Sequence, residues 1–221
     1  MYLIFFVLAM ILSLFMLFIL VRHDFVLVRK SLLLQEIFDI TFFSYLAFLV
    51  SGRLFYVVGE QRFDFFNLLR FFHILKFPGI LFLGGILGFS SIIFFMFSKK
   101  KILARIFDIY FLSMYPLFIF ALLTSYSGGF YLYFTILIFI LSCVFLGIGI
   151  HSYKNYTLKD GSIALLFLCL VSIFTIVSEF SKDARIVFSF FTISQVIGFF
   201  VFIFSSAILL LHEGMLGVRN R

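Results

Sequence analysis

The sequence has few charged residues and almost no proline. Charged residues make up 12% of the 221 residues and there are two prolines, whereas 64% of the residues are hydrophobic and the mean hydropathy is +1.25. A soluble domain carries roughly 25% charged residues. A core of this size cannot bury so much apolar surface in water. The composition therefore excludes a soluble globular protein and predicts an integral membrane protein.

Cysteine and histidine are also scarce, which bears on metal and cofactor chemistry. The two cysteines, Cys143 and Cys169, lie inside apolar stretches, where we expect them to be buried. These cysteines and the four scattered histidines lack the spacing of a metal site. We therefore predict neither a metal nor a cofactor.

Tryptophan is absent, although it normally helps to form the aromatic belt at the membrane interface. The 39 Phe and 10 Tyr must form that belt here. A net charge of +7 is compatible with nucleic-acid binding, but the basic residues flank apolar stretches and the sequence has no nucleic-acid-binding motif. We interpret the positive charge as facing anionic lipid and predict no nucleic-acid partner.

A membrane-spanning helix needs about 20 mostly apolar residues, and the chain contains seven such stretches. We predict a single all-α transmembrane domain over residues 1–221, without internal repeats or a soluble domain. The spans are expected at about residues 2–21, 33–58, 79–98, 103–124, 130–150, 161–180 and 194–211.

The distribution of basic residues predicts the orientation of the spans. The first span has no basic residue before it and Arg22, Arg29 and Lys30 after it, which is the charge order of a retained anchor rather than a cleaved signal peptide. With the N-terminus outside, the stretch "SKKK" at 98–101 falls in an inner loop, as the positive-inside rule requires. We expect an outer N-terminus and a cytoplasmic C-terminus.

The stretch between the second and third spans, residues 59–78, has a polar residue at every third position from 64 to 76. This spacing gives a polar stripe that winds around a helix rich in Phe and Leu. We predict a short helix at the outer membrane interface, with Arg70 and Lys76 reaching the lipid headgroups. Pro78 then begins the third span, where its missing N–H does little harm.

Four spans carry polar or small residues that are predicted to lie at one level of the outer leaflet. One interpretation is a lipid headgroup site, with an arginine on the phosphate and glycines giving access to the backbone. The alternative is a structural ion pair between Arg53 and Glu179, with glycines that allow close helix packing. The residues at this level are Arg53, Tyr56, Gly84, Gly85, Glu179 and Gln195.

A second polar set is predicted toward the inner ends of the spans. It consists of Gln35, Glu36, Asp39, Arg105 and Asp108. We expect the acidic residues to pair with Arg105 or to extend to the inner interface, in preference to forming a proton relay.

Five segments resemble, in this order, the prolipoprotein diacylglyceryl transferases. They read "SGRLFYVV" (51–58), "FPGILFLGGILGF" (77–89), "ARIFDIY" (104–110), "DGSIALLFLCLVSIFTIVSEF" (160–180) and "FTISQVIGF" (191–199). The resemblance covers about residues 40–210. It implies a bacterial inner-membrane protein with seven spans, an outer N-terminus and an inner C-terminus, which agrees with the topology expected from charge.

The resemblance also implies a reaction. This family moves the diacylglyceryl group of phosphatidylglycerol to the thiol of a lipobox cysteine in a prolipoprotein and releases glycerol phosphate. A base helps to form the thiolate, and cations hold the phosphate leaving group. Active members supply these groups with a His before the paired glycines, an Arg–Asn glycine-rich signature after the fourth span, and an Arg four residues before the Glu of the sixth span.

The chain departs from the family pattern at each of these places. Leu83 stands where the pattern has His, Thr175 stands where it has Arg, and residues 122–130 contain neither Arg nor Asn. The outer segment that the family inserts between its fourth and fifth spans is also missing. Because the loss of one electrostatic stabiliser costs about 10²–10³ in rate, normal transferase activity is not expected.

We therefore predict a divergent transferase-like protein that binds phospholipid, phosphatidylglycerol in particular, in an outer-leaflet cleft. Its transferase activity is expected to be impaired or absent. The predicted lipid-binding residues are Arg53, Tyr56, Arg70, Gly84, Gly85, Glu179 and Gln195, and the remaining catalytic candidates are Glu179 and His73. Two alternatives stay open: an active transferase with a rearranged site, which binds a prolipoprotein, and a structural subunit that binds another membrane protein.

Overall fold

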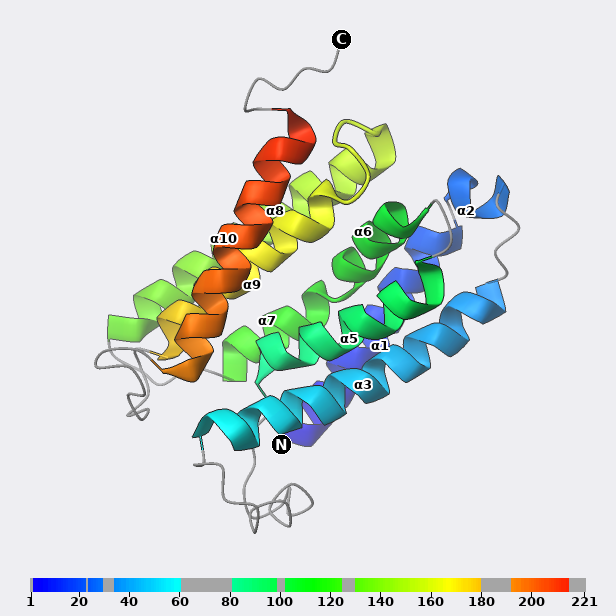
Figure 1. The fold of residues 1–221 in the computed structure, drawn as a ribbon. Coiled ribbons are helices and arrows are strands. Elements are labelled where there is room, and N and C mark those ends of the chain that lie inside the picture. The colour runs from blue at the N-terminus through cyan, green and yellow to red at the C-terminus, as the bar shows by residue number, and fades with distance from the viewer. Residues whose placement is uncertain are drawn as a thin grey trace.

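The computed structural model describes residues 2–22, 24–29, 34–60, 81–98, 102–124, 130–179 and 192–214. Within these ranges every regular element is an α-helix, and the helices lie together as a bundle (Figure 1). The helices are α1 Tyr2–Arg22, α2 Phe25–Arg29, α3 Leu34–Glu60, α5 Phe82–Phe97, α6 Leu103–Ser113, α7 Tyr115–Thr124, α8 Phe130–Asn155, α9 Ser162–Glu179 and α10 Ile193–Glu213.

Five helical stretches are long and apolar enough to cross a membrane, by length and composition. They are Leu34–Val57, Leu103–Leu123, Ile136–Asn155, Ser162–Glu179 and Ser194–Glu213, whereas Phe6–Arg22 and Phe82–Phe97 are apolar but shorter. The all-α prediction is thus confirmed for the described residues, and five of the seven predicted spans coincide with candidate membrane-spanning helices. The interfacial helix predicted at 59–78 lies outside the described residues, apart from the end of α3.

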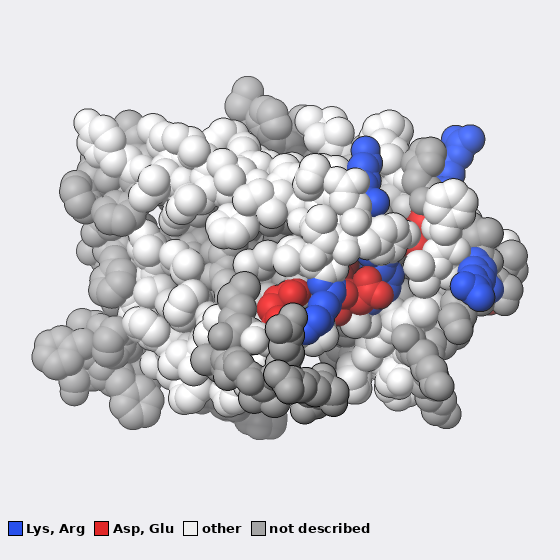
Figure 2. Space-filling model, turned by 90° about the horizontal axis from the view of Figure 1, so that it is seen from above, with Lys and Arg blue, Asp and Glu red and all other residues white. Residues whose placement is uncertain are grey.

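The bundle has two ends, which we name after an arginine at each. At the Arg53 end, α3 and α9 finish and α5 and α10 begin (Figure 1). At the Arg105 end, α1, α8 and α10 finish and α6 and α9 begin. On the face that Figure 2 shows, the charged side chains lie from the middle of the view to its right side, and the described surface on the left is uncharged.

Helix α6 is the centre of the bundle. Most of its residues are buried, and it contacts α1, α5, α8 and α9. The outlying helices pack more simply, since α3 lies mainly on α5 and α10 mainly on α9. Helices α8 and α10 leave most of their apolar surface exposed, which suits contact with lipid chains.

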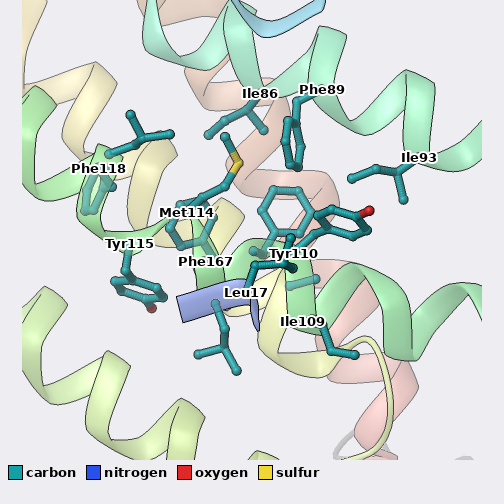
Figure 3. Close-up of a cluster of buried hydrophobic side chains, with 14 of the residues drawn as sticks. Leu17, Ile86, Phe89, Ile93, Ile109, Tyr110, Met114, Tyr115, Phe118 and Phe167 are labelled. Atoms are coloured by element: carbon teal, nitrogen blue, oxygen red, sulfur yellow. The ribbon is translucent and has the colours of Figure 1, made fainter. Parts of the chain in front are cut away.

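Aromatic side chains fill the core around α6 and α7 (Figure 3). Phe167 of α9 packs against Tyr115 and Phe118 of α7, with ring centroids 4.9 and 5.7 Å away. Phe89 of α5 packs edge-on against Tyr110 of α6, with centroids 5.7 Å apart. Tilted and edge-to-face pairs of this kind add to the stabilisation from buried apolar area. They hold α5, α7 and α9 around the central span.

Pro116 explains why the central span consists of two helices. Proline has no N–H to donate to the carbonyl of Leu112, and its ring crowds that carbonyl. At the junction, the N–H of Met114 donates to the carbonyls of Tyr110 and Phe111, at 3.1 and 3.2 Å. Pro116 lies in the first turn of α7, where the loss of one donor is tolerated.

Glycines in α5 allow it to approach α3 closely. A Cβ at Gly88 would lie 2.7 Å from the carbonyl oxygen of Ala47, and a Cβ at Gly84 would lie 2.6 Å from the Cβ of Phe55. Both distances are too short for an ordinary contact, so glycine is required for this approach. Close packing therefore offsets the cost of glycine inside a helix, which is about 1 kcal/mol relative to alanine.

Replacing Gly88 with Ala tests this packing. The added methyl group would collide with the backbone of α3, so we expect Gly88→Ala to lower the free energy of unfolding by about 1–3 kcal/mol. Equilibrium unfolding in mixed micelles measures this change. Gly147 of α8 is the matched control, because a Cβ there meets nothing within 4 Å, and Gly147→Ala should be neutral or stabilising. Equal losses in the two variants would contradict the role of close packing.

Candidate functional site

At the Arg53 end, a capping box joins the start of α10 to the end of α9. The Thr192 side chain accepts from the N–H of Gln195 at 3.2 Å, and Gln195 Oε1 accepts from the N–H of Thr192 at 2.9 Å. The Thr192 hydroxyl also donates to Glu179 Oε2 at 3.5 Å. These three residues are buried. The structure thus brings together two of the predicted site residues, Glu179 and Gln195, through a threonine.

Arg53 lies near the end of α3, and the residue is only 4% exposed. Its guanidinium carbon is 5.5 Å from the centroid of the Tyr56 ring, so these two predicted site residues are neighbours. The carbonyl of Gly52 accepts from the N–H of Leu81 at 3.0 Å, which places the start of α5 beside the arginine. A guanidinium offers a planar set of donors that fits a carboxylate or a phosphate.

The glycines predicted at the outer level pack closely against a neighbouring helix. Gly84 and Gly85 face α3, where a Cβ at Gly85 would lie 2.6 Å from the Phe48 ring. The predicted ion pair of Arg53 with Glu179 stays a prediction. Lipid binding by the predicted residues stays a prediction.

Two other predicted site residues, Arg70 and His73, lie outside the described residues. Their predicted roles in lipid binding and catalysis also stay predictions.

The positions where the family pattern has His and Arg are occupied by packed side chains. Leu83 is 1% exposed and belongs to the hydrophobic core. Thr175 is buried, and its hydroxyl donates to the carbonyl of Val171 in its own helix at 2.9 Å. Neither side chain can accept a proton from a thiol or neutralise a phosphate at physiological pH.

The Arg105 end holds a buried ionic network. Arg105 Nε donates to Asp24 Oδ2 at 2.9 Å, with side chains 4% and 0% exposed. The Tyr153 hydroxyl donates to the same carboxylate oxygen. Asp24 Oδ1 accepts from the N–H groups of Val26 and Leu27, at 2.8 and 3.2 Å. One carboxylate therefore connects α1, α2, α6 and α8, and both of its oxygens are satisfied.

Two tyrosines and a second carboxylate complete the surroundings of Arg105. The guanidinium carbon lies 3.9 Å from the ring centroid of Tyr153 and 4.6 Å from that of Tyr156, which is favourable cation–π geometry. Tyr156 has a left-handed backbone, with φ of 53°, and it begins the connection to α9. In that connection, Asp160 Oδ1 accepts from Arg105 Nη1 at 3.3 Å. The arginine thus holds the α8–α9 connection against α6.

Asp108 lies one helical turn beyond Arg105 and caps α9. Its carboxylate accepts from the N–H of Gly161 at 2.6 Å and from the N–H of Ala164 at 2.8 Å. Free N–H groups at a helix start favour a negative charge. Gly161 has a φ of 98°, which a residue with a side chain rarely adopts. Asp108, which belongs to the neighbouring helix α6, thus caps α9 in place of a side chain from α9 itself.

The same α8–α9 connection is bound on its other side by the end of α10. Glu213 Oε1 accepts from the N–H of Lys159 at 3.1 Å and from the hydroxyl of Ser162. The Lys159 ammonium donates to the carbonyl of His212, and His212 Nε2 lies 3.0 Å from the carbonyl of Asp160. Polar contacts therefore run without a break from α1 through α6 to α10.

Sequence reasoning identified Arg105 and Asp108 but not their partners. Glu36 and Asp39 were expected to pair with Arg105 or to extend to the inner interface. Both residues are exposed at the start of α3. The partners in the structure are Asp24 and Asp160. The signal for Asp24 was an acidic residue in the short polar stretch between two apolar stretches, but its pairing depends on which helices are neighbours.

The expectation that both cysteines are buried is wrong for Cys143. Cys143 is exposed on α8, and Cys169 is partly buried between α9 and α10. Cys169 Sγ lies 3.2 Å from Ser205 Oγ. An apolar thiol can face lipid chains as readily as a protein core, so an apolar stretch alone does not predict burial within the protein.

Comparisons with known proteins identified no relative: no family model, curated protein or solved structure matches this chain.

Breaking the Asp24–Arg105 pair should strongly destabilise the fold. Arg105→Met leaves a buried carboxylate without its cation and is expected to cost about 3–5 kcal/mol in the free energy of unfolding. The double variant Asp24→Asn/Arg105→Met should cost less than the sum of the two single variants. Equilibrium unfolding of the four proteins measures this coupling.

Asp160→Asn provides the control for that cycle. The Asp160 side chain is 49% exposed, so removal of its charge should cost about 1 kcal/mol or less. Strictly additive losses for Asp24→Asn and Arg105→Met would show that the two side chains do not stabilise each other.

Proposed function

We propose that this protein is a divergent member of the diacylglyceryl-transferase fold that binds phospholipid at its Arg53 end and has lost normal transferase activity. In this proposal it crosses the bacterial plasma membrane seven times, with the two shorter apolar helices as additional spans. The N-terminus and the Arg53 end lie on the outer side, and the C-terminus and the Arg105 end lie in the cytoplasm.

The observation that carries the proposal is that the family-like segments contact one another in pairs. "SGRLFYVV" packs on "FPGILFLGGILGF", where Gly84 meets Phe55 and Leu81 bonds to Gly52. "ARIFDIY" caps the start of "DGSIALLFLCLVSIFTIVSEF" through Asp108. The far end of that segment bonds to "FTISQVIGF" through Glu179. Segments that are far apart in sequence thus form mutual contacts, as the parts of one scaffold would.

The proposed loss of activity rests on the chemistry of two positions. Leu83 is buried in the core, and the hydroxyl of Thr175 is bonded to its own helix. A transferase needs a base for the thiol and cations for the leaving phosphate. Among the described residues at the Arg53 end, Arg53 is the only cation. Glu179 is an acidic residue at this end, and it accepts a hydrogen bond from Thr192. This set is suited to hold an anionic headgroup and lacks the cations of the family pattern.

Lipid retention tests the proposed binding. The wild-type protein, purified in a mild detergent, should carry phosphatidylglycerol that mass spectrometry of the lipid extract detects. Arg53→Ala should lose most of this lipid because its guanidinium no longer holds the phosphate. Lys154→Ala is the matched control, since Lys154 is an exposed cation at the opposite end, and its lipid content should not change.

A structural role for Arg53 would give a different result. Arg53→Ala would then unfold, and the lipid content of each folded molecule would stay constant. Arg53→Lys, which keeps the charge, separates the two roles: lipid binding predicts partial retention of phosphatidylglycerol by a folded protein.

Transferase activity is tested in cells depleted of their own diacylglyceryl transferase. We expect that this protein neither restores growth nor yields lipidated prolipoprotein, because the base and the cations of the family pattern are missing. Restored growth with lipidated prolipoprotein would instead establish an active enzyme with a rearranged site. Constant copurification of the same partner chains, without retained lipid, would favour a structural subunit.

A further inference from the structure

Helix α2 presents an aromatic and a basic side chain outward at the Arg105 end. Phe25 is 82% exposed and Arg29 is also exposed. The two residues are four positions apart, so they lie on the same side of a helical turn. Leu27 points the other way and is buried. The short helix is therefore amphipathic, with an exposed side that combines a ring and a cation.

The Asp24 carboxylate holds α2 in this orientation. One oxygen accepts from the N–H groups of Val26 and Leu27, and the other is bound by Arg105 and Tyr153. Turning Phe25 inward would break these bonds or pull Leu27 out of the core. The exposure of Phe25 is thus maintained by a buried network and is not a consequence of a loosely attached segment.

A second cation lies beside α2. Arg22, the last residue of α1, is exposed, and its guanidinium carbon is 5.9 Å from the ring centroid of Phe18. Arg22 and Arg29 flank Phe25 along the chain. The acidic residue between them, Asp24, is buried and bonded to Arg105. Among the described charged residues from 22 to 29, the two exposed ones, Arg22 and Arg29, are therefore both positive.

We propose that Arg22, Phe25 and Arg29 form an anchor that binds anionic phospholipid at the membrane surface next to the Arg105 end. The inference rests on the part of the proposed function in which α1 crosses the membrane, and it concerns the opposite leaflet from the Arg53 site. The phenyl ring enters the boundary between headgroups and acyl chains, and the two guanidinium groups bind lipid phosphates. A lipid surface fits better than a soluble partner because the ring and the cations adjoin an apolar helix end.

A single tryptophan tests the position of Phe25, because the chain contains no tryptophan. The full-length Phe25→Trp variant is reconstituted into vesicles of phosphatidylcholine and phosphatidylglycerol. Quenching by lipids brominated at a shallow or a deep acyl position then reports depth, and iodide reports exposure to water. The anchor predicts quenching by the shallow bromine and protection from iodide. Quenching by iodide alone would overturn the inference.

Phe204→Trp, an exposed position within the candidate span Ser194–Glu213, is the depth control. The proposed membrane topology predicts that its fluorescence is quenched by the deep bromine. If Phe204→Trp behaves as predicted and Phe25→Trp does not, only the anchor fails. If neither tryptophan is quenched by lipid, the membrane placement in the proposed function fails as well.

The preference for anionic lipid is tested in the Phe25→Trp protein. Quenching by brominated phosphatidylglycerol should exceed quenching by brominated phosphatidylcholine, and Arg22→Gln or Arg29→Gln should each reduce this preference about fivefold. Lys154→Gln, which removes an equal charge from the exposed end of α8, should leave the preference unchanged. An equal reduction by Lys154→Gln, or no reduction by either arginine variant, would overturn a localised anchor.

Discussion

The buried carboxylate of Asp24 and the guanidinium of Arg105 form the interaction on which one whole end of the bundle depends. An ion pair away from water costs desolvation energy unless its remaining donors and acceptors are also bonded. Here both carboxylate oxygens and the arginine have further partners, including the Tyr153 hydroxyl and Asp160. The described residues contain no buried side-chain nitrogen or oxygen without a hydrogen bond. The network is therefore complete, and it fixes which helices are neighbours.

The two ends of the molecule differ in a way that bears on function. At the Arg105 end, polar contacts connect α1, α6, α8 and α10 into one structure. Along their lengths, the described parts of α3 and α10 lie mainly on α5 and α9, respectively. The predicted site residues Arg53 and Glu179 belong to these two separate helix pairs.

The sequence predicted those parts of the fold that follow from local composition. Apolar length predicted α1, α3, α5, α9 and α10 to within three residues, but it ended α8 before Asn155, gave one span for α6 and α7, and did not predict α2. The charge pattern identified Arg105 and Asp108 as members of a polar set. The partner of Arg105 could not be predicted, because Asp24 lies 81 positions away and only helix packing brings them together. The glycines of α5 raised the same difficulty. Their number in the sequence indicated a close approach by another helix or a lipid, but only the tertiary structure shows that the approaching element is α3.

We propose that this protein keeps a transferase-like scaffold and uses it to bind phospholipid. An experimental density map of the protein in a phosphatidylglycerol-containing bilayer tests it most directly. The account predicts a phospholipid at the Arg53 end, with its phosphate within hydrogen-bonding distance of the Arg53 guanidinium and with Leu83 still buried in the core. Density that shows only protein groups around Arg53, with no lipid headgroup at this end, would contradict it.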